Sequence, residues 1–502
     1  MDAFLVAAGQ MLDPYTLLLI AASTLIGVLI GALPGLSSTM ATGLLLPFTI
    51  YLEPVSAIAV LAALYCGGTY GGSITAILIN TPGAPPAAAT AFDGYPMALR
   101  GEAGRALGIA TVSSAIGGIF SLVVLLIAAP ALATLAYRFG PAEYFALAVF
   151  GLSMLASISG DSAIKNLIGG CLGVFLSTIG VTLTTGVERF TFGVPELYDG
   201  IDFIPVLIGL FAVSELLSQS AKIGRKLERL VVDAVKLPSL DDFKRCAATI
   251  LRSCGIGTFI GILPAEGGTI ASMIGYNEAR RWSKHRDRFG TGEVEGIAGP
   301  EAANNAATGG AMVPTLALGI PGSGTTAVIL GGLLLHGLRP GPYLFQEQPT
   351  LLYSIFIAML IANVLFLIFG LAGAKIFARV SLIPPTFLWP AVLALCIVGA
   401  YGVNQSVLDI YVMLIAGLIG FVLRRFGFSP APIIMGLVLG TLVENSFSQS
   451  MIIFDQDWSQ FLGRPIATSF FLLAAVGLFY APATKLVRRR WGRRIPAAAI
   501  ED

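Results

Sequence analysis

Four short segments of this 502-residue chain place glycine or proline beside hydroxyl and amide side chains, within sequence that is otherwise apolar. Proline and glycine interrupt helices, and an interrupted helix leaves backbone N–H and C=O groups without partners. A helix that begins at such a break directs free N–H groups toward an anion. The expected helix breaks are Pro34, Gly35, Pro82, Pro264, Pro321 and Gly322.

The residues beside these breaks have the chemistry of a binding site for a small anion. Hydroxyl and amide groups donate hydrogen bonds to carboxylate oxygens, and their oxygen atoms also coordinate cations. Glycine lets a solute approach the backbone closely. We expect the site to be lined by Ser37, Ser38, Thr39, Asn80, Thr81, Gly83, Gly268, Thr269, Asn304, Asn305, Ser323 and Thr325.

Glu266 is an acidic residue at the third break, next to the expected anion site. A carboxylate there would carry a proton, bind a cation or be held away from the solute, so Glu266 is a candidate for coupling to a cation. The two histidines, His285 and His336, and the five scattered cysteines form no metal-ligand cluster in the sequence. We therefore expect no metal site and no cofactor.

The composition predicts the elements that position these residues. Hydrophobic residues make up 56% of the chain, charged residues only 12%, and the mean hydropathy is +0.83. Uncharged runs such as 120–135 and 351–374 approach or exceed the length of about 20 residues that spans a bilayer as a helix. The sequence predicts an all-α integral membrane protein with about 11–12 transmembrane segments.

Internal similarity indicates two related halves. Three pairs of segments resemble each other in the same order along the chain: 31–42 and 261–272, 71–83 and 309–322, and 205–210 and 432–437. We expect a duplication in which each half carries two of the broken segments. The breaks in segments 20–48 and 253–277 are typical of re-entrant hairpins, whose tips would meet near the middle of the membrane.

Clusters of basic residues predict the orientation. They lie in segments 221–252, 280–288 and 485–494, which the positive-inside rule assigns to the cytoplasm. The N-terminal tail carries no basic residue and is expected outside, which gives the two halves opposite orientations. Such inverted repeats are a feature of secondary transporters. The expected organisation is a first membrane repeat (1–220), a basic cytoplasmic linker (221–252), a second, inverted repeat (253–450), a final transmembrane helix (451–485) and a basic cytoplasmic tail (486–502).

The residues argue against enzymes of the membrane. An intramembrane serine protease needs a histidine to activate its serine, and neither histidine of this chain lies in a suitable segment. The segment 158–161 lacks the first glycine of the aspartyl-protease motif GxGD, and the ATP-binding motif GxxxxGK[ST] does not occur. We expect a protein that is not an enzyme.

The motifs together resemble those of the large membrane subunit of tripartite tricarboxylate transporters, the TctA family, over about residues 15–485. The resemblance depends on residues 31–35, 70–72 with 80–83, 261–264, 299–306 and 318–323. It implies a bacterial inner-membrane protein with a periplasmic N-terminus and a cytoplasmic C-terminus. It also implies two partners, a small membrane subunit of about four helices and a periplasmic solute-binding protein. Pro264–Glu266 departs from the Pro-Gly pair expected of the family at the second tip.

The sequence thus predicts a binding-protein-dependent secondary transporter subunit that takes up a di- or tricarboxylate by symport with Na⁺ or H⁺. Its inverted halves would provide alternating access, through an elevator-like movement of the four broken segments. Two alternatives remain open. One is a secondary anion transporter that works without partners, and the other is a membrane enzyme that acts on a phosphorylated lipid.

Overall fold

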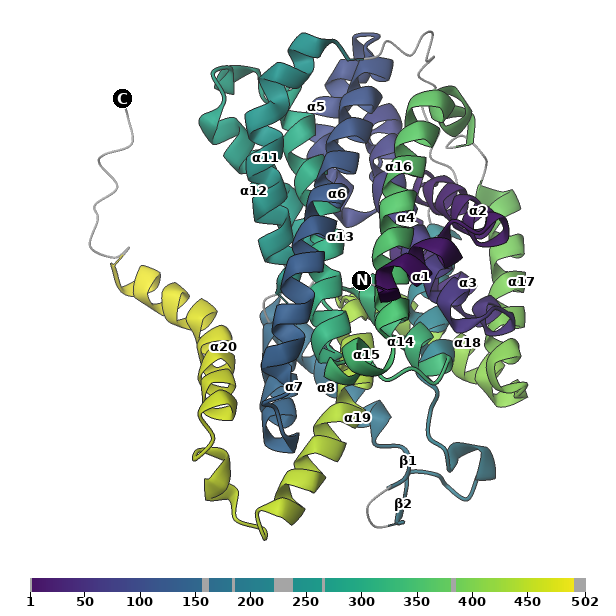
Figure 1. Cartoon of the computed structure of the whole chain (residues 1–502), viewed down its shortest axis with the longest axis vertical. Helices are drawn as coiled ribbons and strands as arrows, with labels where there is room; N and C mark the ends of the chain where they lie inside the picture. Colours follow the sequence, from purple (N-terminus) through teal and green to yellow (C-terminus); the bar gives the residue numbers. More distant parts are fainter. Residues whose placement is uncertain are drawn as a thin grey trace. The chain divides into compact units, whose positions relative to one another are not determined.

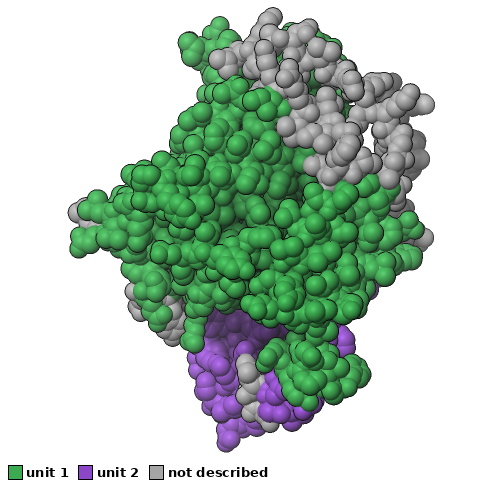
Figure 2. All heavy atoms as spheres, turned by 90° about the vertical axis from the view of Figure 1, so that its right-hand side faces the viewer, with its two compact units in different colours: residues 1–138, 191–426 green, residues 139–190, 427–502 purple. Residues whose placement is uncertain are grey.

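The computed structural model describes residues 2–155, 162–182, 186–220, 238–263, 267–380 and 385–491, and these are almost entirely helical (Figure 1). The chain divides into two compact units, which Figure 2 colours separately. Unit 1 contains residues 1–138 and 191–426, and unit 2 contains residues 139–190 and 427–502. All the expected site residues belong to unit 1.

Unit 1 holds most of the helices. Its elements are α1 (Asp2–Met11), α2 (Pro14–Gly31), α3 (Ser38–Leu45), η1 (Leu46–Tyr51), α4 (Pro54–Ile79), η2 (Pro85–Ala87), α5 (Ala88–Leu99), α6 (Ala103–Ala136), η3 (Pro195–Leu197), α9 (Phe203–Leu207), η4 (Ile208–Val213), α10 (Ser214–Ser220), α11 (Leu240–Ile262), α12 (Gly267–Trp282), η5 (Arg286–Arg288), α13 (Glu295–Leu318), α14 (Gly324–Leu335), α15 (Pro342–Glu347), α16 (Pro349–Val380), α17 (Pro385–Asn404) and α18 (Val407–Arg425).

Unit 2 contains the remaining helices and one short hairpin. Its elements are α7 (Pro141–Leu155), α8 (Ala163–Ser177), β1 (Gly180–Val181), β2 (Glu188–Arg189), α19 (Pro430–Ile453), η6 (Trp458–Phe461) and α20 (Pro465–Trp491). The two strands pair antiparallel, with Gly180 opposite Arg189. An ion pair of 2.7 Å joins Arg189 to Glu444 on α19.

Seven helices of the described residues are long and apolar enough to cross a membrane, so this is a multi-pass membrane protein. That number is smaller than the 11–12 segments predicted, and five further apolar helices are shorter, with 10–17 residues. The candidate spans are Pro14–Gly31, Pro54–Ile79, Ala103–Ala128, Phe203–Ser220, Pro349–Gly373, Val407–Arg425 and Pro430–Ile453. The long uncharged runs of the sequence fall in α6 and α16, as expected.

Small residues let the helices of unit 1 approach closely. Gly31 of α2 packs against the backbone of α4, where a Cβ would lie 2.5 Å from the carbonyl oxygen of Gly68 and 3.0 Å from Cα of Gly71. Gly261 of α11 packs in the same manner against α13, with a Cβ 2.6 Å from the carbonyl oxygen of Ala307 and 3.0 Å from Cα of Gly310. Close backbone approach at small residues is how membrane helices associate. Figure 1 shows α11, α12 and α13 side by side.

Several expected features lie outside the described residues. Pro264 and Glu266 fall in the gap between α11 and α12, so the structure says nothing of the break or of the candidate coupling carboxylate. The expected linker lies partly in the undescribed segment 221–237, while α11 already begins at Leu240. The basic tail after Trp491 is also outside the described residues.

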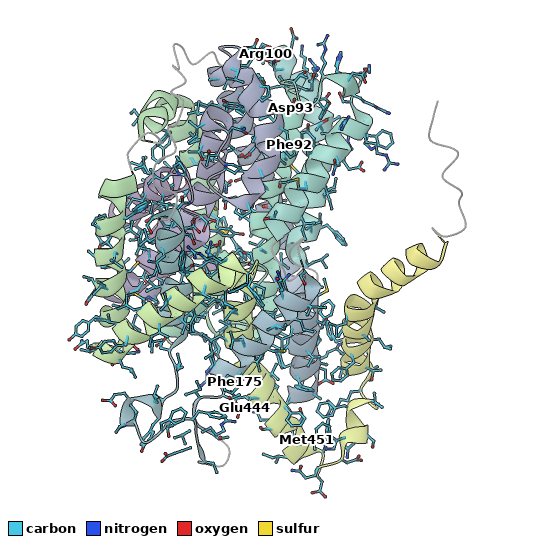
Figure 3. The ribbon with its side chains drawn as sticks, turned by 180° about the vertical axis from the view of Figure 1, so that it is seen from behind. Phe92, Asp93, Arg100, Phe175, Glu444 and Met451 are labelled. Atoms are coloured by element: carbon cyan, nitrogen blue, oxygen red, sulfur yellow. The ribbon has the colours of Figure 1, made fainter. Side chains whose placement is uncertain are left out.

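Asp93 of α5 anchors the connection between α12 and α13. Its Oδ1 accepts hydrogen bonds from the backbone N–H groups of Gly290, Gly292 and Glu293, at 2.9, 2.8 and 2.7 Å. Its Oδ2 accepts one from the hydroxyl of Tyr276, at 3.0 Å. Figure 3 shows the position of Asp93 on α5. These bonds fix the start of α13, the helix that carries Asn304 and Asn305.

Candidate functional site

Two of the broken segments meet at the N-termini of α3 and α14. Ser37 is the N-cap of α3, and its hydroxyl accepts a hydrogen bond from the backbone N–H of Met40. Ser323 is the N-cap of α14 and forms a capping box with Thr326. Caps of this kind satisfy N–H groups at the first turn of a helix. The sequence therefore starts both helices at the residues expected to line the site.

Thr325 joins these two N-termini through its hydroxyl group. Its Oγ1 lies 2.7 Å from Oγ1 of Thr39 and 3.4 Å from Oγ of Ser38. Thr325 is 3% exposed and Ser38 9% exposed, whereas Thr39 is half-buried. A bridging hydroxyl that both donates and accepts connects the first and the fourth broken segments.

Tyr65 extends this hydroxyl cluster from α4. Its phenolic oxygen lies 3.5 Å from Oγ of Ser323. Nothing in the sequence marks Tyr65, because α4 is apolar around it and no helix break lies at this position. Gly324 also lies next to the α3 N-terminus, since a Cβ at this position would lie 3.5 Å from the methyl group of Thr39.

The other two broken segments meet where α12 faces α13. A Cβ built on Gly268, in the first turn of α12, would lie 3.0 Å from Oδ1 of Asn304 and 3.3 Å from Cγ of Pro86. Pro86 belongs to η2, directly after the break at Pro82. The tip of the re-entrant segment 253–277 therefore packs against the break at 80–86, in the first half of the chain. In the same way, the tip of segment 20–48 packs against the break at 319–326, in the second half.

Asn304 and Asn305 are both buried on α13, with 3% and 2% exposure, but their contacts differ. The amide nitrogen of Asn305 donates to the carbonyl oxygen of Glu301 at 3.1 Å. Among the described residues, none forms a hydrogen bond with the side chain of Asn304. The amide atoms of Asn304 are not among the fully enclosed side-chain atoms that lack a partner, so water or a small solute can reach them. Thr269 lies half-buried next to Gly268.

The break between α4 and α5 has a structural explanation for each of its predicted residues. Asn80 is exposed and ends α4 in the left-handed conformation, with a φ of 51°. The hydroxyl of Thr81 donates to the carbonyl oxygen of Ile79 at 3.2 Å. Beyond Pro82, which is half-buried, the N–H of Gly83 donates to the carbonyl oxygen of Gly72 at 3.2 Å.

The two clusters lie close together along α4. Cα of Ser38 would lie 2.9 Å from a Cβ on Gly68, and the backbone nitrogen of Ala84 would lie 3.2 Å from one on Gly72. Positions four residues apart on a helix are separated by about 6 Å. The hydroxyl cluster and the start of the segment that carries Pro86 are thus about one helical turn apart.

The remaining helix-break residues also lie in tight packing. Gly35 has a φ of +82° and faces the side chain of Gln219. Gly322 follows Pro321 and packs against α13, where a Cβ would lie 2.7 Å from Cα of Ala311. Pro34 is half-buried. Since glycine alone tolerates such approach and such a φ, these breaks shape the chain around the two clusters.

This arrangement combines donors and acceptors without a cationic side chain. Hydroxyls from Ser38, Thr39 and Thr325 and the amide of Asn304 can hydrogen bond to carboxylate oxygens, and the same oxygen atoms can coordinate a small cation. No Lys, Arg or His side chain of the described residues hydrogen bonds to these groups. The geometry suits a small polar solute more than covalent chemistry.

A sequence model described as the tripartite tricarboxylate transporter TctA family matches residues 17–435. A protein of Agrobacterium vitis, described as an uncharacterized 52.8 kDa protein in the TAR-I ttuC' 3' region, is 40% identical over 468 residues, which are 93% of this chain and 92% of the relative. A second Agrobacterium vitis protein, described as an uncharacterized protein in the TAR-II ttuC' 3' region, is 38% identical over 225 residues, which are 45% of this chain and 93% of that relative. No solved structure gives a significant match.

Proposed function

This chain belongs to the tripartite tricarboxylate transporter TctA family, the large membrane component of such transporters, and we propose that it takes up a di- or tricarboxylate by symport with Na⁺ or H⁺. It is a transporter subunit and not an enzyme, which removes the alternative of a membrane enzyme acting on a lipid phosphate. The proposed partners are a small membrane subunit of about four helices and a periplasmic solute-binding protein.

The observation that carries the proposal is the Asn304 side chain, which forms no hydrogen bond with another described residue and faces Gly268 in the first turn of α12, where Pro86 of η2 also lies. A carboxylate held there would accept hydrogen bonds from the Asn304 amide and from N–H groups in the first turn of α12, which have no partner within the helix. The hydroxyl groups of Ser38, Thr39 and Thr325 would bind a second carboxylate group or the coupling cation; Ser38 contacts α4 about one helical turn from the segment that leads to Pro86.

Equivalent contacts in the two halves support an inverted repeat. Gly31 packs closely against the backbone of α4, and Gly261 packs in the same way against α13. Both α4 and α13 end in a residue with left-handed backbone conformation, two positions before a proline. After α4, the N–H of Thr81 donates to the carbonyl oxygen of Thr75, and after α13 the N–H of Ile320 donates to that of Pro314. Repeats of this kind provide alternating access in secondary transporters.

We further propose that the four broken segments move together, in an elevator-like step, against the other membrane helices. The N-terminus would face the periplasm and the segments 221–252 and 280–288 the cytoplasm, because basic residues favour that side. The residues proposed to line the site are those expected from the sequence, of which Asn304, Thr325, Thr39 and Ser38 have the clearest structural support.

The test is uptake by cells that lack their own carboxylate transporters. The chain would be expressed alone, with the small membrane subunit, and with both partners, and uptake of labelled citrate and of a panel of dicarboxylates measured. We expect uptake only with both partners and only for carboxylates. Uptake by the chain alone would favour the stand-alone anion transporter. An intact complex that takes up no carboxylate would contradict the proposed solute class.

A further inference from the structure

Glu301 is a carboxylate in the interior of unit 1, on α13, with 0% exposure. Thr90 of α5 donates a hydrogen bond to its Oε1 at 2.5 Å, and Ser114 of α6 donates one to its Oε2 at 2.8 Å. Among the described residues, no Lys, Arg or His forms an ion pair with Glu301. The carboxylate is therefore held by hydroxyl groups alone and has no compensating charge.

The ionisable groups on the helices around Glu301 do not supply that charge. Arg105 of α6 pairs with Asp242 and Glu102, and it precedes Ser114 by nine residues, or about 13 Å along the helix. The basic residues of α11 and α12 form no ion pair with Glu301: Arg245 pairs with Glu293, Arg281 pairs with Glu278, and Arg252 bonds to Thr249. The other two basic residues of these helices are Lys244 and Arg280. The remaining ionisable groups are neutral or acidic, and α14 carries none. They are Tyr65, Cys66 and Tyr70 on α4, Asp93 and Tyr95 on α5, Asp241, Asp242, Cys246 and Cys254 on α11, Tyr276 and Glu278 on α12, Glu295 on α13 itself and Glu347 on α15.

A buried carboxylate without a counter-charge costs several kcal/mol, so the neutral acid competes with the ion. The two hydroxyls suit both forms, because each can donate to the ionised carboxylate or turn to accept from the protonated one. Metal ions need room for oxygen ligands at about 2.3–2.6 Å each. Here the hydroxyl oxygens already lie within hydrogen-bonding distance of the carboxylate, so the arrangement fits a proton better than a metal ion.

Glu301 is linked directly to the candidate solute site. Asn304 follows it by three residues and so lies on the same face of α13. Thr90 belongs to α5, which continues directly from η2, and Pro86 of η2 faces Gly268. A change in the protonation of Glu301 can therefore reach the solute site by two routes: along α13 to Asn304, and through Thr90 and α5 to Pro86 of η2.

We propose that Glu301 is the proton-binding group that couples solute uptake to the proton gradient, and this deepens the proposed function, on which it rests. A proton from the outer aqueous phase binds the carboxylate to form the neutral acid when the site is open to that side. The acid O–H then donates to a neighbouring hydroxyl while the site changes sides. The proton leaves to cytoplasmic water after the solute, which restores the carboxylate.

The experiment compares the wild-type complex with Glu301→Gln in proteoliposomes that contain both proposed partners. Two rates are measured: net uptake of labelled solute under an inward proton gradient, and exchange of labelled for unlabelled solute without any gradient. Glutamine keeps the neutral shape but cannot release a proton. We expect at least a 20-fold loss of net uptake, with exchange within about 3-fold of wild type. Glu53→Gln, at an exposed position before α4, serves as the matched control.

A second measurement needs no variant, and so covers a Glu301→Gln protein that fails to fold. Wild-type complex is treated with dicyclohexylcarbodiimide, which modifies protonated carboxyl groups in apolar surroundings, and the adducts are mapped by mass spectrometry. We expect modification of Glu301, at least 5-fold slower with saturating solute. The proposal is overturned if Glu301→Gln keeps gradient-driven uptake, if wild-type uptake responds to Na⁺ alone, or if Glu301 stays unmodified. A wild-type complex that transports no carboxylate would instead remove the proposed function itself.

Discussion

Oγ1 of Thr39 lies 2.7 Å from Oγ1 of Thr325, although 286 residues separate them in the chain. The bond joins the N-terminus of α3 to that of α14, and thus the first broken segment to the fourth. Ser38 approaches the same oxygen at 3.4 Å. A break in one half of the sequence is therefore completed by a break in the other.

Thr325→Val tests this junction. Valine has nearly the same shape but no hydroxyl, so Ser38 and Thr39 lose their shared partner in a buried place, at a cost of about 1–3 kcal/mol. We expect the initial rate of carboxylate uptake to fall about 10-fold at equal protein abundance in the membrane. Thr134→Val is the control, because Thr134 is exposed and its hydroxyl bonds only within its own helix. Equal uptake rates for the two variants would show that the contact between Thr325 and Thr39 does not contribute to transport.

Asn304→Ala removes a buried amide that forms no hydrogen bond with another described residue. We expect uptake to fall by at least 10-fold while membrane abundance and thermal stability stay near wild type, because the described residues lose no hydrogen bond. Uptake is measured over a series of solute concentrations, to separate affinity from maximal rate. Asn277→Ala, at an exposed position of α12, is the matched control. Wild-type uptake by Asn304→Ala would remove this residue from the site.

Gly268→Ala adds one methyl group at the meeting point of α12, α13 and η2. That methyl group would lie 3.0 Å from Oδ1 of Asn304, closer than most Cβ contacts. We expect solute affinity to weaken about 5-fold, with normal abundance, as measured by solute-dependent thermal stabilisation. Gly255→Ala on α11 adds the same methyl group where nothing lies within 4 Å, and it should behave as wild type. Unchanged affinity in Gly268→Ala would show that this contact lies away from the solute.

Asp93→Ala tests the anchor between α5 and the connection before α13. Three backbone N–H groups and the Tyr276 hydroxyl lose their acceptor, and the two buried donors, the N–H of Glu293 and the hydroxyl of Tyr276, each cost about 1–3 kcal/mol when unsatisfied. We expect destabilisation of at least about 3 kcal/mol, seen as a lower unfolding temperature in detergent. Asp287→Ala alters an exposed acid in the same connection and should have little effect. Similar unfolding temperatures for both variants would contradict the anchoring role.

The ion pair between Arg105 and Asp242 predicts a pH dependence of stability. Hydrogen bonding to Arg105, at 2.5 and 3.0 Å, lowers the pKa of Asp242 below its ordinary value of 3.8. A lowered folded-state pKa gives stabilisation that is complete above pH 3.8 and is lost as the pH falls through the folded-state pKa.

The measurement is a double-mutant cycle of Arg105→Met and Asp242→Asn, followed by thermal unfolding at several pH values. We expect a favourable coupling energy at pH 7 that shrinks toward zero in acid. The cycle cancels the titration of other carboxylates. Coupling that does not change between pH 7 and pH 3 would contradict an interaction that depends on the charge of Asp242.

The four breaks were predictable because proline and glycine act locally. Helices end or begin near each predicted break that the structure describes, and Ser37 and Ser323 are the N-caps of α3 and α14. Composition likewise predicted a helical membrane protein. The number of spans was less predictable, because α13 is buried throughout and carries acidic residues that a hydropathy argument counts against a membrane helix.

The partners of each break were harder to predict. Nothing in the local sequence indicates that Thr325 meets Thr39, or that Gly268 meets Pro86, because those contacts depend on how the two halves of the sequence pack. Tyr65 gave no signal within an apolar helix. Glu301 lies in a motif that was recognised from the sequence, but its hydroxyl partners come from α5 and α6, and only the folded chain brings them together.

The most direct test of the central claim is uptake of labelled citrate and dicarboxylates into proteoliposomes that contain both membrane subunits. Na⁺ and proton gradients are imposed separately, with and without the solute-binding protein. We expect accumulation above the external concentration, which requires a cation gradient and the binding protein and is lost in Asn304→Ala. Accumulation that is independent of both gradients, or no carboxylate uptake by a well-folded complex, would contradict it.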